Sequence, residues 1–153
     1  MTMDVAEYAR LRRDTKRENE VADWLRGIKE SERVKFLKEL AELNAFAATI
    51  LIRKSQLEPV SLAVFLRYGL KVGDASSVNW WIQATHAGLG PKKLLAELRS
   101  QISTNPEGVD KALYFIPQYF VDDEKYQSSA RSFRSEFRKI HPGYVRPEQG
   151  HLS

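Results

Sequence analysis

The chain has 153 residues, of which 42% are hydrophobic and 29% charged, a composition typical of one globular domain and not of a disordered chain. It contains no cysteine, which excludes disulfides, thiolate nucleophiles and cysteine-held zinc or iron–sulfur sites. The formal net charge of +4, from 24 Lys and Arg against 20 Asp and Glu, permits a nucleic-acid partner without requiring one.

No segment of the sequence is predicted to enter a membrane. The N-terminal stretch MTMDVAEYARLRRDTKRENE lacks the apolar core that a signal peptide needs. The most apolar run, 45–52, stops at Arg53, far short of the roughly 20 residues that span a bilayer. We therefore expect a soluble, cytoplasmic protein with no membrane partner.

Apolar residues recur with helical spacing along nearly the whole chain, and no segment shows the alternation of a half-buried strand. The first predicted helix covers 4–26, and its polar middle, RRDTKRENE, indicates either a break or an exposed turn. The second starts with Ser31 as its N-cap and runs through 45–52. That run is apolar on all sides, which predicts the central core element. Phe46 is expected to be buried in it, with a loss of about 3–5 kcal/mol on replacement by alanine.

Proline and capping residues predict where the later helices begin. Pro59 suits the first turn of a third helix, because a first turn leaves that amide unpaired in any case. Pro117 is expected to kink or end the sixth helix. The seventh is expected to end at Ile140. The predicted starts of helices four to seven are, in order, a cap at Asp74, Ser76 or Ser77, then Pro91, then about Glu107, and then a cap at Asp122 or Asp123.

These elements predict an all-α fold with about six or seven helices. Residues 1–140 are expected to form a single all-helical domain, and 141–153 an irregular C-terminal tail. Short helices joined by short turns fit either a helical bundle or a short irregular solenoid of helix pairs.

The stretch VNWWIQATHAGLGPKK has some features of a phosphate-binding loop, because glycines and lysines meet there at a predicted helix start. It lacks the four-residue gap and the Lys-Ser/Thr pair of such loops, and no strand precedes it. We interpret it as a connection between helices that binds no nucleotide. In this interpretation Gly88 takes the left-handed conformation, Gly90 bends the chain and Pro91 starts the next helix.

Trp80 and Trp81 are adjacent, so their side chains diverge by about 100° on a helix. Either the helix is packed on two sides, or one indole reaches the surface and anchors a partner. Burial is the more usual role of aromatic residues. Trp80 is the candidate partner anchor.

Motifs of known chemistry are absent from the sequence. The histidines His86, His141 and His151 lie far apart, with no metal-binding spacing among them. No serine lies in a Gly-x-Ser-x-Gly context. We therefore predict no catalytic residue, no metal site and no cofactor.

The last predicted helix carries the most informative charge pattern. Arg131, Arg134 and Arg138 fall within about 60° of one another, and Lys139 follows them. We expect these four residues to contact an anionic partner, with the three arginines exposed together. Arginine forks suit phosphate, and an acidic protein would fit equally well. The opposite side is expected to dock the helix through its apolar residues, Tyr126, Ala130, Phe133, Phe137 and Ile140.

Three hypotheses of function follow from these patterns. The first is a non-catalytic helical protein-interaction domain, such as an adaptor, scaffold or regulator. The alternative is a nucleic-acid-binding helical domain that uses the basic C-terminal helix. The third is an enzyme with a pocket between helices.

Overall fold

The structure, a computed structural model, describes residues 3–146, and every regular element in that range is helical. The predicted all-α fold is therefore confirmed. The α-helices are α1 (Val5–Arg10), α2 (Thr15–Arg26), α3 (Glu30–Leu43), α4 (Ala45–Lys54), α5 (Pro59–Val72), α6 (Ser77–Ser100), α7 (Pro106–Phe115) and α8 (Glu124–Ile140), and a 3-10 helix, η1 (Ile116–Phe120), follows α7.

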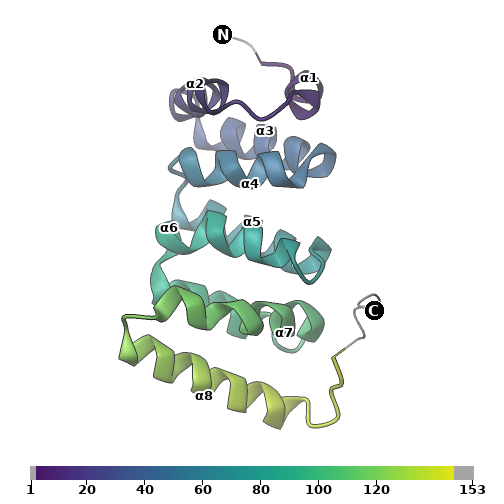
Figure 1. The fold of residues 1–153 in the computed structure, drawn as a ribbon, viewed down its shortest axis with the longest axis vertical. Coiled ribbons are helices and arrows are strands. Elements are labelled where there is room, and N and C mark those ends of the chain that lie inside the picture. Colours follow the sequence, from purple (N-terminus) through teal and green to yellow (C-terminus); the bar gives the residue numbers. More distant parts are fainter. Residues whose placement is uncertain (1–2, 147–153) are drawn as a thin grey trace.

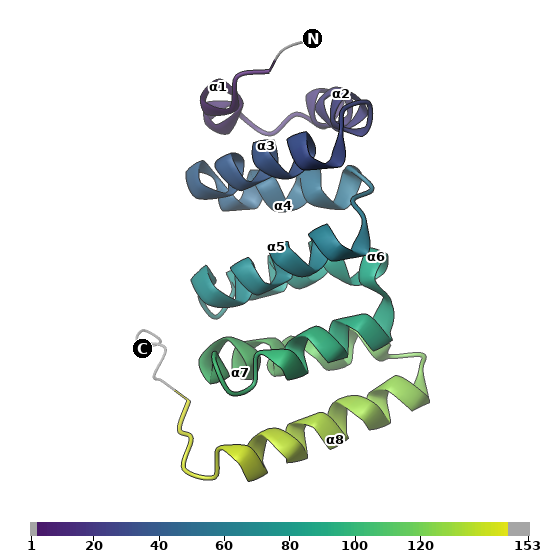
Figure 2. The same cartoon turned by 180° about the vertical axis from the view of Figure 1, so that it is seen from behind.

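The helices are stacked in layers along one long axis (Figure 1). The first layer holds α1 and α2, and the second holds α3 and α4. The third pairs α5 with the first half of α6, and the fourth pairs the second half of α6 with α7, as the view from behind also shows (Figure 2). Helix α8 closes the stack alone. Of the two architectures left open by the sequence, this is the short solenoid of helix pairs.

The polar middle of the first predicted helix is a break. Residues 11–14 separate α1 from α2, and Asp14 caps α2 by accepting hydrogen bonds from the backbone amides of Lys16 and Arg17. An aspartate in this position satisfies amides that the first turn would otherwise leave unpaired. Gly27 follows the last residue of α2.

The second predicted helix is also two helices. Asn44 has non-helical backbone angles, and its side chain accepts a hydrogen bond of 3.1 Å from the amide of Ala47, so it caps α4. Its amide nitrogen donates to the carbonyl of Ala9 in α1. The predicted cap Ser31 is wrong, because α3 already begins at Glu30 and has no side-chain cap.

The predicted core segment 45–52 is buried only in its second half. The residues from Ala48 to Ile52 are buried, whereas Phe46 is 39% exposed. The expected burial of Phe46 is wrong because α4 starts at Ala45, which puts Phe46 in a first turn at the margin of the layer. The loss of stability expected for a fully buried Phe46 therefore does not apply.

One apolar core runs through all layers of the stack. Each layer contributes side chains that are almost completely removed from solvent. They include Leu25, Leu37, Leu51, Leu66, Leu94 and Phe133. Each layer therefore buries its apolar side against the next, as stacked helix pairs must.

The predicted connection at 88–93 is a kink at which the two helical segments of α6 meet, and the second segment starts at Pro91 as expected. Gly90 has φ 79° and ψ 160°, so the bend expected there is confirmed. Gly88 does not take the left-handed conformation, and that part of the interpretation is wrong. A Cβ atom on Gly88 would instead overlap the Cδ1 atom of Leu62, so the missing side chain lets α6 approach α5 closely.

Replacing Gly90 by alanine is expected to lower the free energy of unfolding by about 1–3 kcal/mol, because this backbone region is open almost only to glycine. Space is not limiting, since a Cβ atom there would meet nothing within 4 Å. Urea denaturation followed by circular dichroism measures the loss. Gly143→Ala is the control, because its Cβ is equally free and its φ is not positive. Equal, small losses for both variants would contradict the assigned backbone conformation.

The predicted effect of Pro117 is confirmed. Helix α7 ends at Phe115, two residues before the proline, and the chain continues as the 3-10 helix η1. Asp123 then caps α8, with its side chain accepting from the amide of Tyr126. Beyond α8, residues 141–146 are irregular, with only His141 and Tyr144 partly buried, and the remainder of the expected tail, 147–153, lies outside the described residues.

Candidate partner-binding surfaces

The two adjacent tryptophans have different environments. Trp81 is 1% exposed and packs against the rings of Phe65 and Tyr68, with centroids 6.5 and 5.3 Å away. Trp80 is only half-buried, and its indole meets the edge of the Phe46 ring at 5.0 Å. Of the two alternatives, the structure therefore has one tryptophan in the core and one reaching the surface.

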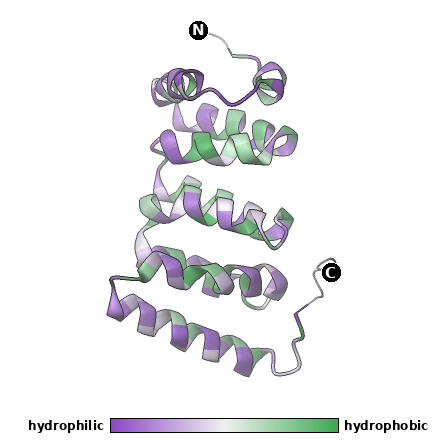
Figure 3. Ribbon diagram, viewed as in Figure 1, coloured by the Kyte–Doolittle hydropathy of each residue, from purple (hydrophilic) through white to green (hydrophobic). Residues whose placement is uncertain are grey.

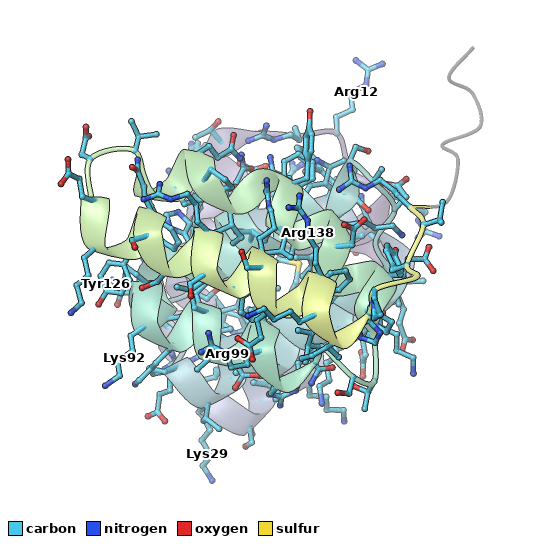
Figure 4. The ribbon with its side chains drawn as sticks, turned by 90° about the horizontal axis from the view of Figure 1, so that it is seen from below. Arg12, Lys29, Lys92, Arg99, Tyr126 and Arg138 are labelled. Carbon is cyan, nitrogen blue, oxygen red and sulfur yellow. The ribbon has the colours of Figure 1, made fainter. Side chains whose placement is uncertain are left out.

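Trp80 lies in a surface region that joins three segments of the chain. Two adjoining shallow pockets share Arg13 and Phe46, and the guanidinium carbon of Arg13 is 5.6 Å from the centroid of the Phe46 ring. Arg12 lines one pocket and Arg53 the other. Seen along the long axis, Arg12 extends away from the body of the molecule (Figure 4). We call this region, formed by Arg12, Arg13, Phe46, Arg53 and Trp80, the Trp80 face.

The charge of the Trp80 face comes from two arginines. Arg13 forms an ion pair with the buried Glu18 at 3.0 Å, and Lys54 lies 3.6 Å from the same carboxylate. The hydrogen bond from Arg13 lowers the pKa of Glu18, against the opposing effect of its burial. Within residues 3–146, neither Arg12 nor Arg53 has an ion-pair partner. The face is therefore an aromatic pair with two arginines outside any ion pair at its rim, and the Asp14 carboxylate, which caps α2, lines the same pocket as Arg12.

The four basic residues singled out on α8 do not share one environment. Arg131, Arg138 and Lys139 are exposed. Arg134 is half-buried, and its Nη2 atom donates a hydrogen bond of 2.6 Å to the carbonyl oxygen of Leu113 in α7. The expectation that the three arginines are exposed together is therefore wrong for Arg134.

The apolar side of α8 docks the helix as expected, except at its end. Ala130, Phe133 and Phe137 are buried, and Tyr126 is partly buried. Ile140 is 43% exposed, so its assignment to the buried side is wrong. It is the last residue of the helix. Hydrophilic residues predominate on the outer surface of α8 (Figure 3).

One acidic residue of α8 is already paired with the neighbouring layer. Glu136 accepts a hydrogen bond of 3.1 Å from Arg99 of α6, and the Arg99 guanidinium also lies over the ring of Phe133. Arg99 and Arg138 lie on opposite sides of α8 (Figure 4). Glu136 is therefore engaged on the side of the helix away from Arg138.

A cleft of about 580 Å³ lies between α7, α8 and the segment that follows α8. Arg134 and Arg138 line it from α8, whereas Arg131 and Lys139 do not. We call it the α8 cleft. Its lining residues are Asp110, Leu113, Tyr114, Arg134, Phe137, Arg138, His141, Pro142, Tyr144 and Arg146.

The segment after α8 folds back to form one wall of the α8 cleft. Arg146 makes two hydrogen bonds to the carboxylate of Asp110, at 2.7 and 3.1 Å, and this contact raises the pKa of Arg146. The Tyr144 ring meets Phe137 edge-on at 5.3 Å, and burial raises the pKa of its hydroxyl. His141 bonds through Nε2 to the carbonyl of Ile102 at 2.7 Å. No local pattern in the sequence indicates the contacts of His141 and Arg146, because each of them joins residues more than 30 positions apart.

A further groove of about 610 Å³ lies between α3 and α5 and was not predicted. Lys38 and Glu42 line it from α3, and Phe65, Tyr68 and Lys71 from α5. Burial raises the pKa of the Tyr68 hydroxyl, and the charge of Glu42 raises it further. This groove is the kind of inter-helical pocket that the enzyme hypothesis needs.

Within residues 3–146, no group of three or more His, Cys, Asp and Glu side chains is placed to hold a metal ion. None of the helices described there is both long and apolar enough to cross a membrane. Lys92 and Lys93 are exposed after the kink of α6, and the absence of nucleotide binding there stays a prediction.

Comparison with known proteins does not place the chain in a family. No family model matches it, and neither the curated proteins nor the solved structures include a match. The fold defines its class as a short all-α stack of helix pairs. Function must therefore be argued from the surfaces described above.

Proposed function

We propose that this protein is a non-catalytic helical protein-interaction domain, and that its partner binds the Trp80 face through an acidic segment that carries an apolar side chain. The observation that supports this most is the Phe46–Trp80 pair, in which two large aromatic side chains from different layers meet at the surface. Tryptophan and arginine are among the residues most enriched at the energetic centres of protein interfaces. We place this function in the cytoplasm.

The chemistry of the rim favours an acidic partner. Arg12 lines one of the two pockets that share Phe46 and Arg53 lines the other, and neither has an ion-pair partner in the described part of the chain. An arginine can bind a carboxylate with two parallel hydrogen bonds. A leucine or aromatic side chain between two acidic residues would then cover Phe46 and Trp80 and satisfy both cations.

The nucleic-acid hypothesis is supported less well. Aromatic and basic side chains together also bind single strands, because every base can stack on an aromatic ring. The basic helix on which that hypothesis depended has its central arginine, Arg134, bound to a carbonyl of its own protein. A nucleic-acid strand along the outer side of α8 would meet only three exposed basic side chains, Arg131, Arg138 and Lys139, which is a small contact for a chain whose net charge is only +4.

A peptide-display selection tests the proposal without knowledge of the natural partner. A random library is selected on the wild-type protein after depletion on Trp80→Ala, and the enriched peptides are synthesised. We expect aspartate and glutamate around a leucine or aromatic residue, and at least about a tenfold loss of affinity for Trp80→Ala by calorimetry. Arg53→Glu should slow association with the same peptide, because a rim charge acts mainly on the encounter rate.

Val60→Ala is the matched control, because Val60 is an exposed apolar residue, 70% accessible, away from the Trp80 face. It should leave peptide affinity unchanged, and circular dichroism should confirm that every variant is folded. Enrichment of peptides without acidic residues, or equal effects of the Trp80 and Val60 variants, would refute the proposal. Generic DNA and RNA are titrated in parallel near physiological salt. No affinity at roughly 100 μM protein would eliminate the nucleic-acid alternative.

A further inference from the structure

We propose that the α8 cleft is a binding site for a phosphate monoester dianion, with Arg134 and Arg138 as the principal ligands of the phosphate. The cleft shares no residue with the Trp80 face. The inference therefore stands independently of the proposed protein partner.

The charge of the α8 cleft matches a dianion. Asp110 is its acidic residue, and the two hydrogen bonds from Arg146 neutralise it. Arg134 and Arg138 then leave two positive charges that no carboxylate compensates within residues 3–146. A phosphate monoester carries a charge of about −1.5 to −2 at pH 7.

The two arginines are placed to act together on one ligand. They are four residues apart on α8, and side chains at this spacing are neighbours on a helix surface. Arg134 is held in place by its hydrogen bond to the Leu113 carbonyl, which uses one of its five N–H donors. A donor fixed in this way loses less conformational freedom when a ligand binds. Arg138 is exposed and supplies the second fork from the rim.

The size and lining of the cleft indicate an ester with an organic body. A volume of about 580 Å³ lies within the range of roughly 300–1,000 Å³ that is usual for small-molecule sites. The rings of Tyr114, Phe137 and Tyr144 line it beside the arginines. An aromatic or aliphatic group attached to the phosphate could therefore contact apolar surface while its oxygens meet the guanidinium groups. Inorganic phosphate would leave those rings uncovered.

The wall formed by residues 141–146 gives the cleft a defined shape. Three contacts hold this segment: His141 to Ile102, the Tyr144 ring on Phe137, and Arg146 to Asp110. The Tyr144 hydroxyl is buried and has no hydrogen-bond partner among residues 3–146. A buried polar group of this kind is uncommon in folded proteins.

Calorimetric titration of the full chain with phenyl phosphate tests the proposal, with phenyl sulfate as a monoanion of similar shape. We expect saturable binding of phenyl phosphate and at least tenfold weaker binding of phenyl sulfate. Arg138→Gln should weaken phenyl phosphate binding at least tenfold. Arg131→Gln is the matched control, because it removes the same charge from an exposed position of the same helix outside the cleft. Its affinity should stay within twofold of the wild type.

A phosphoserine peptide and its unphosphorylated form distinguish the source of the phosphate. Binding of the phosphopeptide in preference to phenyl phosphate, with the same sensitivity to Arg138→Gln, would assign the site to phosphorylated protein. The reverse preference would assign it to a small molecule. Equal losses for the Arg131 and Arg138 variants, equal affinity for phenyl sulfate, or no binding of either phosphate probe would overturn the proposal. Trp80→Ala should leave phenyl phosphate binding unchanged, which separates this test from that of the protein partner.

Discussion

Replacement of Trp81 by alanine is expected to lower the free energy of unfolding by about 3–5 kcal/mol, the usual cost of truncating a buried aromatic side chain. Trp81 is 1% exposed and is packed against Phe65, Tyr68 and Gly69 of α5. The indole fills the space between α5 and α6, so alanine would leave a cavity that close-packed neighbours cannot fully close. The same change at Trp80 is expected to cost about 1–2 kcal/mol, because part of that indole already faces solvent.

Urea denaturation of the two tryptophan variants measures this difference, with circular dichroism as the signal. The comparison is internally controlled, because the same substitution is made at neighbouring positions of one helix. Equal losses at the two positions would mean that Trp80 and Trp81 are buried to the same extent. That result would also remove the structural basis for a partner site at Trp80.

Replacement of Gly69 by alanine is expected to cost about 3 kcal/mol, at the upper end of the usual cost of overpacking a core. A Cβ atom on Gly69 would lie within 2.6 Å of three atoms at the base of the Trp81 side chain. The clash involves the Cβ and Cγ atoms of Trp81, so rotation of the indole cannot relieve it. Alanine would otherwise favour the helix by about 1 kcal/mol, and the overlap must outweigh this gain.

A double-mutant cycle tests whether Gly69 acts through Trp81. In the Trp81→Ala background the Gly69→Ala change should cost much less, because the atoms that it would overlap have been removed. The interaction energy should exceed about 1.5 kcal/mol, within the range measured for residues in contact. Gly143→Ala, whose Cβ would meet nothing within 4 Å, serves as the control and should be neutral. Additive costs for Gly69 and Trp81 would show that α5 and α6 do not meet at this point.

Local signals in the sequence predicted most of the fold. Pro59 and Pro117 act through the amide they lack and through their ring, so their effects on α5 and α7 could be predicted without knowledge of the neighbours. Asn44 was missed because the apolar spacing continues through it, and an asparagine is compatible with a helix interior as well as with a cap. Its role becomes visible only when α1 is in place, since its side chain also bonds to the carbonyl of Ala9.

The two glycines at the kink of α6 also show what could not be predicted from the sequence. Gly88 and Gly90 both precede Pro91, and either could end a helix by its backbone freedom. The close approach at position 88 is to the end of the Leu62 side chain of another helix. Such an approach depends on how two helices cross, and a single sequence does not contain that information.

The candidate sites were predicted in part. Helical geometry predicted the exposed positions of Arg131 and Arg138, because those depend only on which side of α8 is apolar. Arg134 donates to the backbone carbonyl of Leu113 in α7. Every residue type has such a carbonyl, so nothing about the residue at position 113 could have predicted this hydrogen bond. The roles of Tyr144 and Arg146 depend on the return of the chain over α7, which no local pattern indicates.

The kinked helix α6 has a consequence for the mechanics of the molecule. In most stacks of helix pairs, adjoining layers are joined by a short turn and can hinge or unfold one at a time. Here one helix belongs to two layers, with Gly90 as the only residue of α6 outside the helical conformation. The third and fourth layers are therefore joined at the backbone of one residue, and a change in the tilt between these two layers is concentrated at Gly90, whose φ of 79° lies outside the helical range. Any partner that pulls on the Trp80 face applies its load to the first segment of α6, and Gly90 is the point through which that load reaches the segment that contacts α8.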